Sequence, residues 1–314
     1  MMKITVKTPA RLHLGLIDLN GNLGRLYGSI GVAIDRPNVV LEATKSDELE
    51  VLGKEPERCE EAVEKFSAFY KIEPNARIDV KECIPVHCGL GSGTQLALAV
   101  ATALARIHGI KASIRELASA MGRGFISGIG VAAFEKGGFI IDGGLNVVNQ
   151  TPPHPIFQHS FPSEWVYVVA VPEIRKGLSG KDEKDTFANI VPGPEKYAAE
   201  ISRLVLMKML PALIEKDIEA FGYAISEVDK KTGEYYKDTT PQDGACAAIM
   251  ERMLGAGAQG AGQSSWGPAV YGLAEKESAT KLEAAVNDYM REKGINGDVF
   301  TTEANNRGVE IEKE

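Results

Sequence analysis

The sequence predicts an α+β protein built from two lobes. Its first part is rich in strands, and a glycine-rich turn then leads into a long amphipathic helix. Its last part places strand, helix and strand after a helical stretch, which is typical of a second α+β unit. A chain of 314 residues is long enough for about two domains. We therefore predict one lobe over residues 1–160 and another over 161–314.

The charge balance argues against nucleic acid as a partner. The formal net charge is -8, the isoelectric point is near 5.4, and no Lys/Arg-rich block is present. No apolar run approaches the roughly 20 residues that span a bilayer, and the first residues lead straight into a strand instead of a signal peptide. The cysteines form no CxxC pair, and the histidines have no metal-type spacing. We expect a cytoplasmic protein with reduced thiols and no membrane partner.

The N-terminal strand carries a candidate anion-binding pair. Arg11 and His13 share one face of it, where they suit a phosphate or a carboxylate. A surface arginine beside a satisfied histidine is the alternative. The opposite face is predicted to be buried because its apolar residues share one parity: Ile4, Val6, Leu12, Leu14 and Leu16. The elements expected next are strands over 29–35 and 39–43, a helix over 55–69 and a strand over 77–84.

The stretch from Pro85 to Gly109 is the centre of the prediction. Glycines and small hydroxyl residues come first, and an amphipathic helix follows. Glycine lets backbone N–H groups turn inward, and the first N–H groups of a helix are unpaired and partly positive. Loop and helix together form an anion site, most naturally for phosphate or diphosphate. A plain glycine-rich turn capped by Ser92 or Thr94 is the alternative.

A second glycine-rich loop follows closely. A capping box at Ser113 and Glu116 predicts a short helix that ends near residue 121. The loop over 122–130 comes next, with Arg123 and Ser127 as its polar members. Paired glycines then bracket a short strand, which indicates tight turns near another backbone or a ligand. Plain turn chemistry is the alternative.

The second lobe is predicted to begin after an irregular connection over 151–162. A strand over 165–171 leads to the basic loop 175–180, which is either a second phosphate clamp or an exposed turn. Helices are expected over 195–236 and 245–254, and a third glycine-rich stretch follows over 255–268. The remaining elements are expected to be a strand over 269–273, a helix over 279–293 and short strands over 298–302 and 309–311.

The order of these glycine-rich stretches resembles the GHMP superfamily of small-molecule kinases, which includes galactokinase, homoserine kinase and mevalonate kinase. The resemblance implies an N-terminal lobe like ribosomal protein S5 domain 2 and a ferredoxin-like C-terminal lobe, with phosphates bound between them. The chain departs from the kinase pattern at two positions. Gly93 stands where the kinases usually have a second serine, and Gly130 stands where they often have a catalytic Asp. Phosphoryl transfer to an alcohol is therefore doubtful.

Five blocks of the chain carry a narrower resemblance, which accounts for these departures. They are residues 10–18, 27–35, 89–95, 122–130 and 177–180. In these blocks the chain is similar to the family of β-ribofuranosylaminobenzene 5′-phosphate synthases, enzymes of methanopterin biosynthesis. The family condenses phosphoribosyl pyrophosphate with 4-aminobenzoate or 4-hydroxybenzoate to a C-riboside 5′-phosphate, and it releases carbon dioxide and pyrophosphate. The resemblance implies Mg²⁺ as cofactor and a homodimer.

We combine the resemblance with the residues into a hypothesis for the site. The catalytic candidates are Arg11 and His13, for substrate anions, and Asp18, for Mg²⁺ or a ribose hydroxyl. The phosphate-binding candidates are Gly89, Gly91, Ser92, Gly93, Thr94, Gln95, Arg175 and Lys176. The substrate-binding candidates are Arg123, Ser127, Gln263, Ser264, Ser265 and Trp266. Trp266 either stacks on an aromatic ring or is an ordinary core residue.

Two other functions remain open at this point. A GHMP kinase acting on a small alcohol would form ADP from ATP, and Gly130 argues against it. A non-catalytic protein that binds a phosphorylated ligand would be stabilised by that ligand without turnover. The sequence does not choose between the two benzoates as acceptor, and it identifies no metal ligands.

Overall fold

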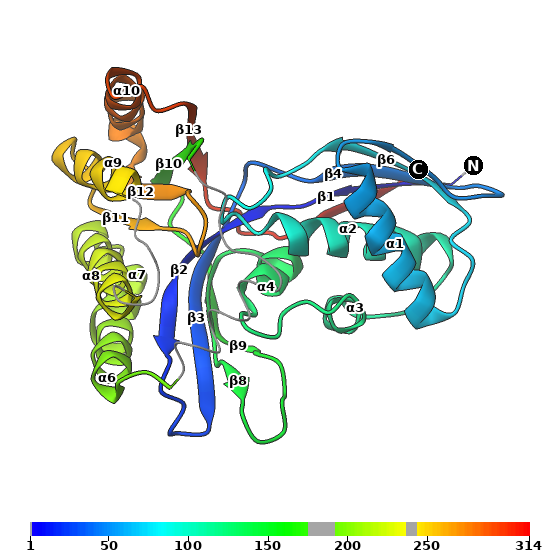
Figure 1. Ribbon diagram of the computed structural model, residues 1–314, viewed down its shortest axis with the longest axis horizontal. Coiled ribbons are helices and arrows are strands. Elements are labelled where there is room, and N and C mark those ends of the chain that lie inside the picture. Colours follow the sequence, from blue (N-terminus) through cyan, green and yellow to red (C-terminus); the bar gives the residue numbers. More distant parts are fainter. Residues whose placement is uncertain (1, 175–191, 237–243) are drawn as a thin grey trace.

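The computed structural model describes residues 2–174, 192–236 and 244–314, and within these ranges the strands form three sheets (Figure 1). The first sheet joins the two ends of the chain, because β14 pairs antiparallel with β1. The termini accordingly lie next to each other in Figure 1. Its strands, in the order β14-β1-β4-β6-β5, are β14 (Glu310–Lys313), β1 (Lys3–Lys7), β4 (Val40–Lys45), β6 (Ala76–Glu82) and β5 (Glu50–Gly53).

Two helices cover this sheet. Helix α1 (Pro56–Tyr70) packs on α2 (Ser92–Ile107), and α2 in turn packs on β1 and β4. Nearly every residue of α2 is buried, because alanines alternate with larger apolar side chains and let neighbouring elements approach from several directions. The predicted amphipathic helix is thus the central helix of this part of the molecule. The last strand, β14, lies in the same sheet as the first strand, β1, so this sheet contains both ends of the chain. The lobe boundary at residue 160 stays a prediction.

The second sheet carries the candidate residues on its strand β2. The single strand expected from Ile4 to Leu16 is wrong, because β1 pairs within the first sheet and β2 within the second. The second sheet follows the order β2-β3-β7-β9, and the short strand β8 pairs with β3. Its strands are β2 (Ala10–Asp18), β3 (Arg25–Ile34), β7 (Phe139–Asp142), β8 (Leu145–Asn146) and β9 (Pro155–His159). The expectation of an irregular stretch over 151–162 is wrong, because β9 pairs with β7 in that stretch. Pro155 is tolerated there since it is the first residue of the strand.

The third sheet has the predicted ferredoxin-like topology. The order along the chain is strand, several helices, two strands, helix, strand. The order across the sheet is β11-β12-β10-β13, and all neighbouring strands pair antiparallel. The strands are β10 (Trp165–Pro172), β11 (Gly260–Gln263), β12 (Val270–Glu275) and β13 (Gly297–Glu303). The helices are α6 (Glu195–Leu204), the π-helical turn η1 (Val205–Met209), α7 (Leu210–Glu215), α8 (Ile218–Tyr236), α9 (Gly244–Gly255) and α10 (Lys276–Glu292).

Two short helices complete the part of the fold that positions the site. The predicted capping box is present at the start of α3 (Ile114–Ala120), where Ser113 and Glu116 bond to each other's backbone. Helix α4 (Ile129–Lys136) is absent from the sequence prediction, because Gly128 and Gly130 are poor helix formers and the sequence pattern predicts a loop up to residue 130.

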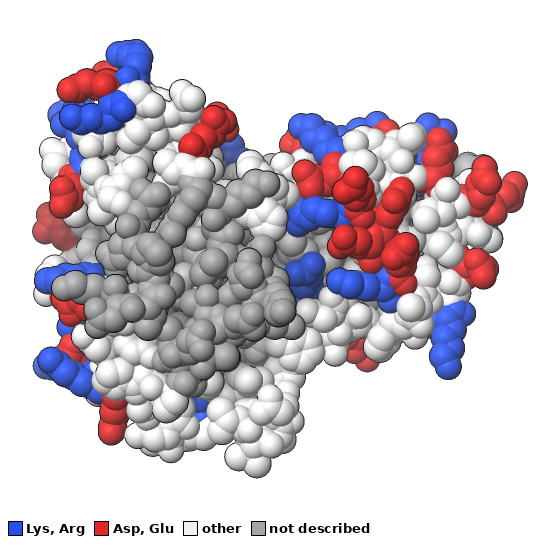
Figure 2. All heavy atoms as spheres, in the orientation of Figure 1, with Lys and Arg blue, Asp and Glu red and all other residues white. Residues whose placement is uncertain are grey.

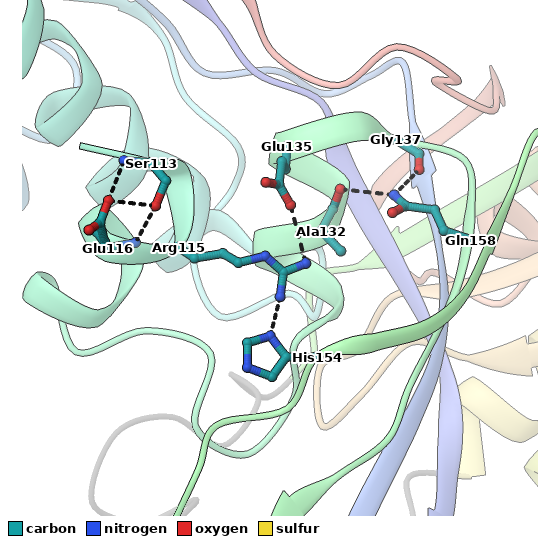
Figure 3. A network of polar contacts seen from close by, with 8 residues as sticks. All are labelled: Ser113, Arg115, Glu116, Ala132, Glu135, Gly137, His154 and Gln158. Carbon is teal, nitrogen blue, oxygen red and sulfur yellow. Dashed lines mark hydrogen bonds and ion pairs between the residues drawn. The ribbon is translucent and has the colours of Figure 1, made fainter. Parts of the chain in front are cut away.

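A polar network fixes α4 from two directions (Figure 3). Arg115 of α3 reaches across to Glu135 of α4 at 3.3 Å and to the ring of His154. Gln158 of β9 donates its side-chain N–H to the Gly137 carbonyl at 2.8 Å and to the Ala132 carbonyl at 3.3 Å. These contacts hold the helix between α3 and the second sheet. In the described ranges, no helix is both long and apolar enough to cross a membrane.

Candidate active site

Two glycine-rich stretches from distant parts of the chain touch each other. A β-carbon on Gly89 would lie 2.1 Å from the Ser264 carbonyl oxygen, and one on Gly267 would lie 2.1 Å from the Cys88 carbonyl carbon. Hydrogen bonds join the two stretches, since the Ser264 hydroxyl donates to the Gly89 carbonyl at 2.7 Å and the Ala269 N–H donates to the Cys88 carbonyl at 3.1 Å. Only glycine permits so close a contact between the loops.

Arg11 lies along the first of these loops. Its guanidinium donates to the Gly89 carbonyl, and its backbone N–H donates to the Leu90 carbonyl at 3.2 Å. A β-carbon on Gly91 would lie 3.0 Å from Cγ of Arg11, so the glycine leaves room for the arginine side chain. Arg11 and the glycine loop, which the sequence analysis both assigned to the candidate site, are therefore neighbours in the structure.

His13 lies two residues further along β2 and is buried. Its backbone N–H donates to the Ser264 hydroxyl at 3.0 Å, which ties β2 to the third glycine-rich stretch. Burial, with the Arg11 charge as a second cause, lowers the pKa of the imidazole to about 3. His13 is therefore neutral near pH 7. It cannot bind substrate anions as a cation, and its ring is limited to accepting or donating hydrogen bonds as a neutral group.

The start of α2 presents backbone donors beside Arg11. Gly91 precedes the helix with φ of 85°, and the N–H groups of Thr94 and Gln95 both donate to its carbonyl at 3.1 Å. The N–H groups of Ser92 and Gly93 have no acceptor within the described part of the chain. Two backbone donors at the positive end of a helix, next to an arginine, are an arrangement suited to an anion, and the anion site itself stays a prediction.

Thr94 and Gln95 face α4 instead of the loop's open side. Gln95 is fully buried and donates its side-chain N–H to the Gly130 carbonyl at 2.8 Å. A β-carbon on Gly130 would lie 3.2 Å from Cγ2 of Thr94. Among the phosphate-binding candidates, Gln95 is thus a positioning residue that joins the starts of α2 and α4.

Asp142 holds the start of α4 in place through hydrogen bonds. The sequence analysis did not include Asp142 among the site residues. Its buried carboxylate accepts the N–H groups of Gly128 at 2.8 Å, Gly144 at 2.9 Å and Ser29 at 3.0 Å. Burial raises its pKa, and these three hydrogen bonds oppose the shift. An acidic residue between two glycine pairs was the available signal. Ser127, a substrate-binding candidate, accepts the Ile129 N–H at 3.3 Å on the same turn.

The segment 263–266 closes the site from the third sheet. The Gln263 N–H donates to Asp229 of α8 at 2.8 Å, and its side-chain N–H donates to the Gly267 carbonyl at 2.9 Å. Burial raises the pKa of Asp229 to about 6, against the lowering effect of the Gln263 hydrogen bond. Ser265 takes φ of 57° in the turn that follows. Asp229 is a second positioning residue that sequence patterns did not reveal.

Trp266 directly precedes Gly267, the residue that contacts the glycine loop. It is half-buried and packs in a small apolar cluster with Leu16, Tyr27 and Ile126, next to Gly267. Tyr27 has φ of 74°, a conformation that is rare for a large side chain and that clusters at functional sites. Tyr27 pairs with Asp18 at the far end of β2, so Trp266 is the member of the cluster that is joined to the glycine loop, through Gly267.

Asp18 is placed away from Arg11. Seven residues of strand separate them, which corresponds to about 23 Å, so the two side chains cannot bind the same atom. The Asp18 carboxylate accepts the N–H groups of Asn20 at 2.7 Å and Gly21 at 3.0 Å, and it thereby closes the turn between β2 and β3. Arg175 and Lys176, the remaining phosphate-binding candidates, lie outside the described residues.

Arg123 completes the set from the loop after α3. A β-carbon on Gly93 would lie 3.3 Å from Nη1 of Arg123, so this guanidinium covers the first turn of α2. The glycine loop is therefore flanked by Arg11 at one end and by Arg123 at the other. No cluster of three or more His, Cys, Asp or Glu side chains suited to a metal ion occurs in residues 2–174, 192–236 and 244–314.

The comparisons with known proteins agree with this fold. Residues 57–138 match the model of the GHMP kinases N terminal domain, and residues 209–292 match that of the GHMP kinases C terminal domain. A homoserine kinase structure from Cytophaga hutchinsonii superposes with a TM-score of 0.71 at 18% identity, over 99% of this chain and 97% of that one. At that identity the likeness concerns the fold alone. The chain belongs to the GHMP superfamily.

Closer relatives narrow the assignment. The beta-ribofuranosylphenol 5′-phosphate synthase of Methanothermobacter thermautotrophicus is 38% identical, with 98% of each chain covered. The protein of the same name from Archaeoglobus fulgidus is 37% identical, over 98% of this chain and 99% of that one. This chain belongs to the family of beta-ribofuranosylphenol 5′-phosphate synthases, and the resemblance stated from its motifs is confirmed.

Proposed function

We propose that this chain is a decarboxylating pentosyltransferase that acts in methanopterin biosynthesis. It condenses phosphoribosyl pyrophosphate with 4-hydroxybenzoate or 4-aminobenzoate and releases carbon dioxide and pyrophosphate. Membership of the synthase family supports the activity. In the structure, the observation that supports this activity most is the loop 89–93, which offers backbone donors and is flanked by Arg11 and Arg123. Position 130, where many GHMP kinases have a catalytic aspartate, is a glycine.

The diphosphate of the sugar donor is proposed to lie on this loop. The N–H groups of Ser92 and Gly93 and the guanidinium of Arg11 would face its oxygens. Bond breakage at the anomeric carbon transfers the bonding electron pair to the diphosphate and leaves an oxocarbenium-like sugar. Fixed donors at the positive end of α2 stabilise the negative charge that grows on the leaving group. They need no reorganisation during the reaction.

The second half of the reaction needs positioning more than a base. The para oxygen or nitrogen of the acceptor donates electrons into the ring carbon that bears the carboxylate. That carbon attacks the anomeric carbon, and the C–CO₂ bond then breaks and returns its electron pair to the ring. No proton has to be removed from an attacking hydroxyl, in contrast to a kinase acting on an alcohol. The absence of an acid at Gly130 fits this chemistry.

The acceptor ring is proposed to lie against Trp266. Trp266 directly precedes Gly267, which contacts the glycine loop, and its half-buried ring packs on Leu16. Stacking would orient the acceptor, and burial of its ring would exclude water from the anomeric carbon. The relatives are named for a phenol product. Loss of carbon dioxide from 4-hydroxybenzoate leaves a phenol, so we favour it over 4-aminobenzoate.

Mg²⁺ is proposed as a cofactor that arrives with the diphosphate. The described residues offer no acidic cluster for an all-protein cage, and Mg²⁺ commonly binds through substrate phosphates and water with few protein ligands. The ion would neutralise part of the charge on the leaving group. A cytoplasmic homodimer is proposed with it, which sedimentation analysis of the purified protein tests directly.

The decisive assay uses purified protein, Mg²⁺, phosphoribosyl pyrophosphate and carboxyl-labelled 4-hydroxybenzoate. Labelled carbon dioxide and pyrophosphate should appear in equal amounts, and only when both substrates are present. The same assay with 4-aminobenzoate ranks the two acceptors. ADP formation from ATP and a small alcohol, without carbon dioxide release, would instead establish a kinase. Ligand-dependent thermal stabilisation with neither reaction would indicate a binding protein.

A further inference from the structure

The outer side of the helices α6 to α8 carries exposed apolar side chains. Helices α6, η1 and α7 follow one another as one row, and α8 packs against all three. We call their outer side the helical face. Leu206 and Met207 of η1 are 63% and 70% exposed, Ile214 of α7 is 54% exposed, and Tyr223 of α8 is 52% exposed. Large apolar side chains gathered on one surface of a globular protein mark an interaction site.

These side chains form one patch because the geometry of the helices brings them together. Ile214 follows Met207 and Leu206 by about two turns of helix, so the three side chains lie on one side of the row. The amine of Lys208 lies over the ring of Tyr223, 4.9 Å from its centroid, and this contact joins η1 to α8 within the helical face. The patch therefore extends across both helical rows.

Opposite charges border the patch at its two ends. Arg203 of α6 precedes Leu206 and Met207 by one turn, so it lies on the same side of the row. Glu215 ends α7, directly after Ile214. Both charged side chains are exposed, and neither forms an ion pair with another residue that the structure describes. They lie about 18 Å apart along the row, with the apolar residues between them.

This order of charges matches itself under two-fold symmetry. In a two-fold dimer, both subunits use the same surface and the surfaces run in opposite directions. When two rows pair antiparallel about a point midway between Arg203 and Glu215, the arginine of each copy lies opposite the glutamate of the other. The apolar side chains of the two copies then cover one another at the centre. An apolar centre with a charged rim is the usual anatomy of a protein–protein interface.

The size and the mixed charge of the helical face also suit a second copy of the chain. Each row has about 20 residues and is therefore about 30 Å long, and two rows are about 20 Å wide. One subunit would contribute roughly 600 Å², and two would bury roughly 1,200 Å², the lower end of the range for stable interfaces. Along the edge formed by α6 to α8, at the left of Figure 2, Lys/Arg and Asp/Glu side chains both occur and neither sign prevails. Nucleic acid or an anionic membrane would favour a basic surface instead.

We propose that the helical face joins two copies of this chain in a two-fold dimer. Leu206, Met207 and Ile214 form its centre, and Arg203 of each copy pairs with Glu215 of the other. The inference rests on the homodimer that the proposed function includes, and it names the surface through which that dimer forms.

Sedimentation velocity over a series of protein concentrations measures the dissociation constant of the dimer. Met207→Lys should raise this constant about tenfold or more, because it places a charge in the apolar centre of the interface. Val148→Lys is the matched control, since Val148 is 86% exposed and follows β8, outside the helical face. It should leave the constant within about twofold of the wild type. Both substitutions change exposed side chains, and an unchanged melting temperature shows that each variant is folded.

An exchange of charges tests the two-fold arrangement itself. Arg203→Glu and Glu215→Arg should each raise the dissociation constant about tenfold, because each sets like charges opposite one another twice in a symmetric dimer. The double variant should return to within about threefold of the wild type. Further weakening in the double variant would overturn the proposed pairing.

The remaining outcomes separate this interface from the other proposals. A dimer that Met207→Lys leaves unchanged would overturn the helical face as the interface, while the homodimer itself would stand. A wild type that is monomeric at every concentration would overturn both. Carbon dioxide release, measured separately, decides on the catalytic function whichever oligomeric state is found.

Discussion

Gly93 and Gly130 show at the residue scale how this chain differs from the kinases that share its fold. At position 93 the missing side chain leaves space for Arg58 and Arg123. At position 130 the space is occupied by Thr94, whose Cγ2 would lie 3.2 Å from a β-carbon. An aspartate at that position would require Thr94 to move. Both departures thus follow from contacts around the start of α2.

Arg11→Ala should lower the turnover rate without unfolding the protein. The side chain lies on the glycine loop, and its loss removes a charged donor from the diphosphate site. We expect kcat/KM to fall about tenfold to hundredfold, the effect of one hydrogen bond to a charged group. Arg106→Ala is a matched control, since Arg106 is exposed in the last turn of α2. Normal turnover by a folded Arg11→Ala protein would exclude this role.

His13 should make the free energy of unfolding depend on pH. Its pKa is about 3 in the folded protein against an ordinary value of 6.5. Between these values the unfolded chain binds a proton that the folded chain does not, so the His13 contribution destabilises the protein as the pH falls through that window. Urea denaturation at pH 7 and pH 5 should show a smaller pH effect in His13→Gln than in the wild type. An equal pH effect would contradict the buried neutral imidazole, and His159→Gln, at an exposed position, serves as control.

At the element scale, the site depends on contact between the loop before α2 and the turn after β11. Gly89→Ala should destabilise the protein and abolish turnover, because its β-carbon would lie 2.1 Å from the Ser264 carbonyl oxygen. Gly109→Ala is the matched control. Gly109 also has a positive φ, of 68°, but a β-carbon there meets nothing within 4 Å. A larger fall in melting temperature for Gly89→Ala isolates the clash, and equal falls would mean that only backbone strain matters.

The sequence predicted most elements but not all of the site. Apolar patterns located α2, β10 and β12, because burial leaves a local pattern in the sequence. The sequence reasoning missed β11 (Gly260–Gln263), which lies inside the third glycine-rich stretch and pairs with β12. It missed α4, whose start is held by Asp142 and by packing on Thr94. Such long-range contacts override the local preference of glycine for loops, and a local pattern cannot reveal them.

In the whole molecule, the site is formed where segments that are far apart in the sequence come into contact. Arg11 comes from the second sheet, Gly89 from the loop before α2, and Ser264 from the third sheet. The sequence motifs predicted that these segments meet, through a family resemblance. Asp229 escaped prediction because its role depends on tertiary contact, in which its carboxylate accepts the Gln263 N–H.

The loop 89–93, which resembles the phosphate loop of kinases, is proposed to hold the diphosphate of a sugar donor. A crystal structure of the protein with Mg²⁺ and inorganic pyrophosphate would show where the diphosphate binds. We expect it within hydrogen-bond distance of the Ser92 and Gly93 N–H groups and of the Arg11 guanidinium. A diphosphate bound away from residues 89–93, or a loop that takes up ATP and excludes pyrophosphate, would mean that the loop does not bind the sugar donor.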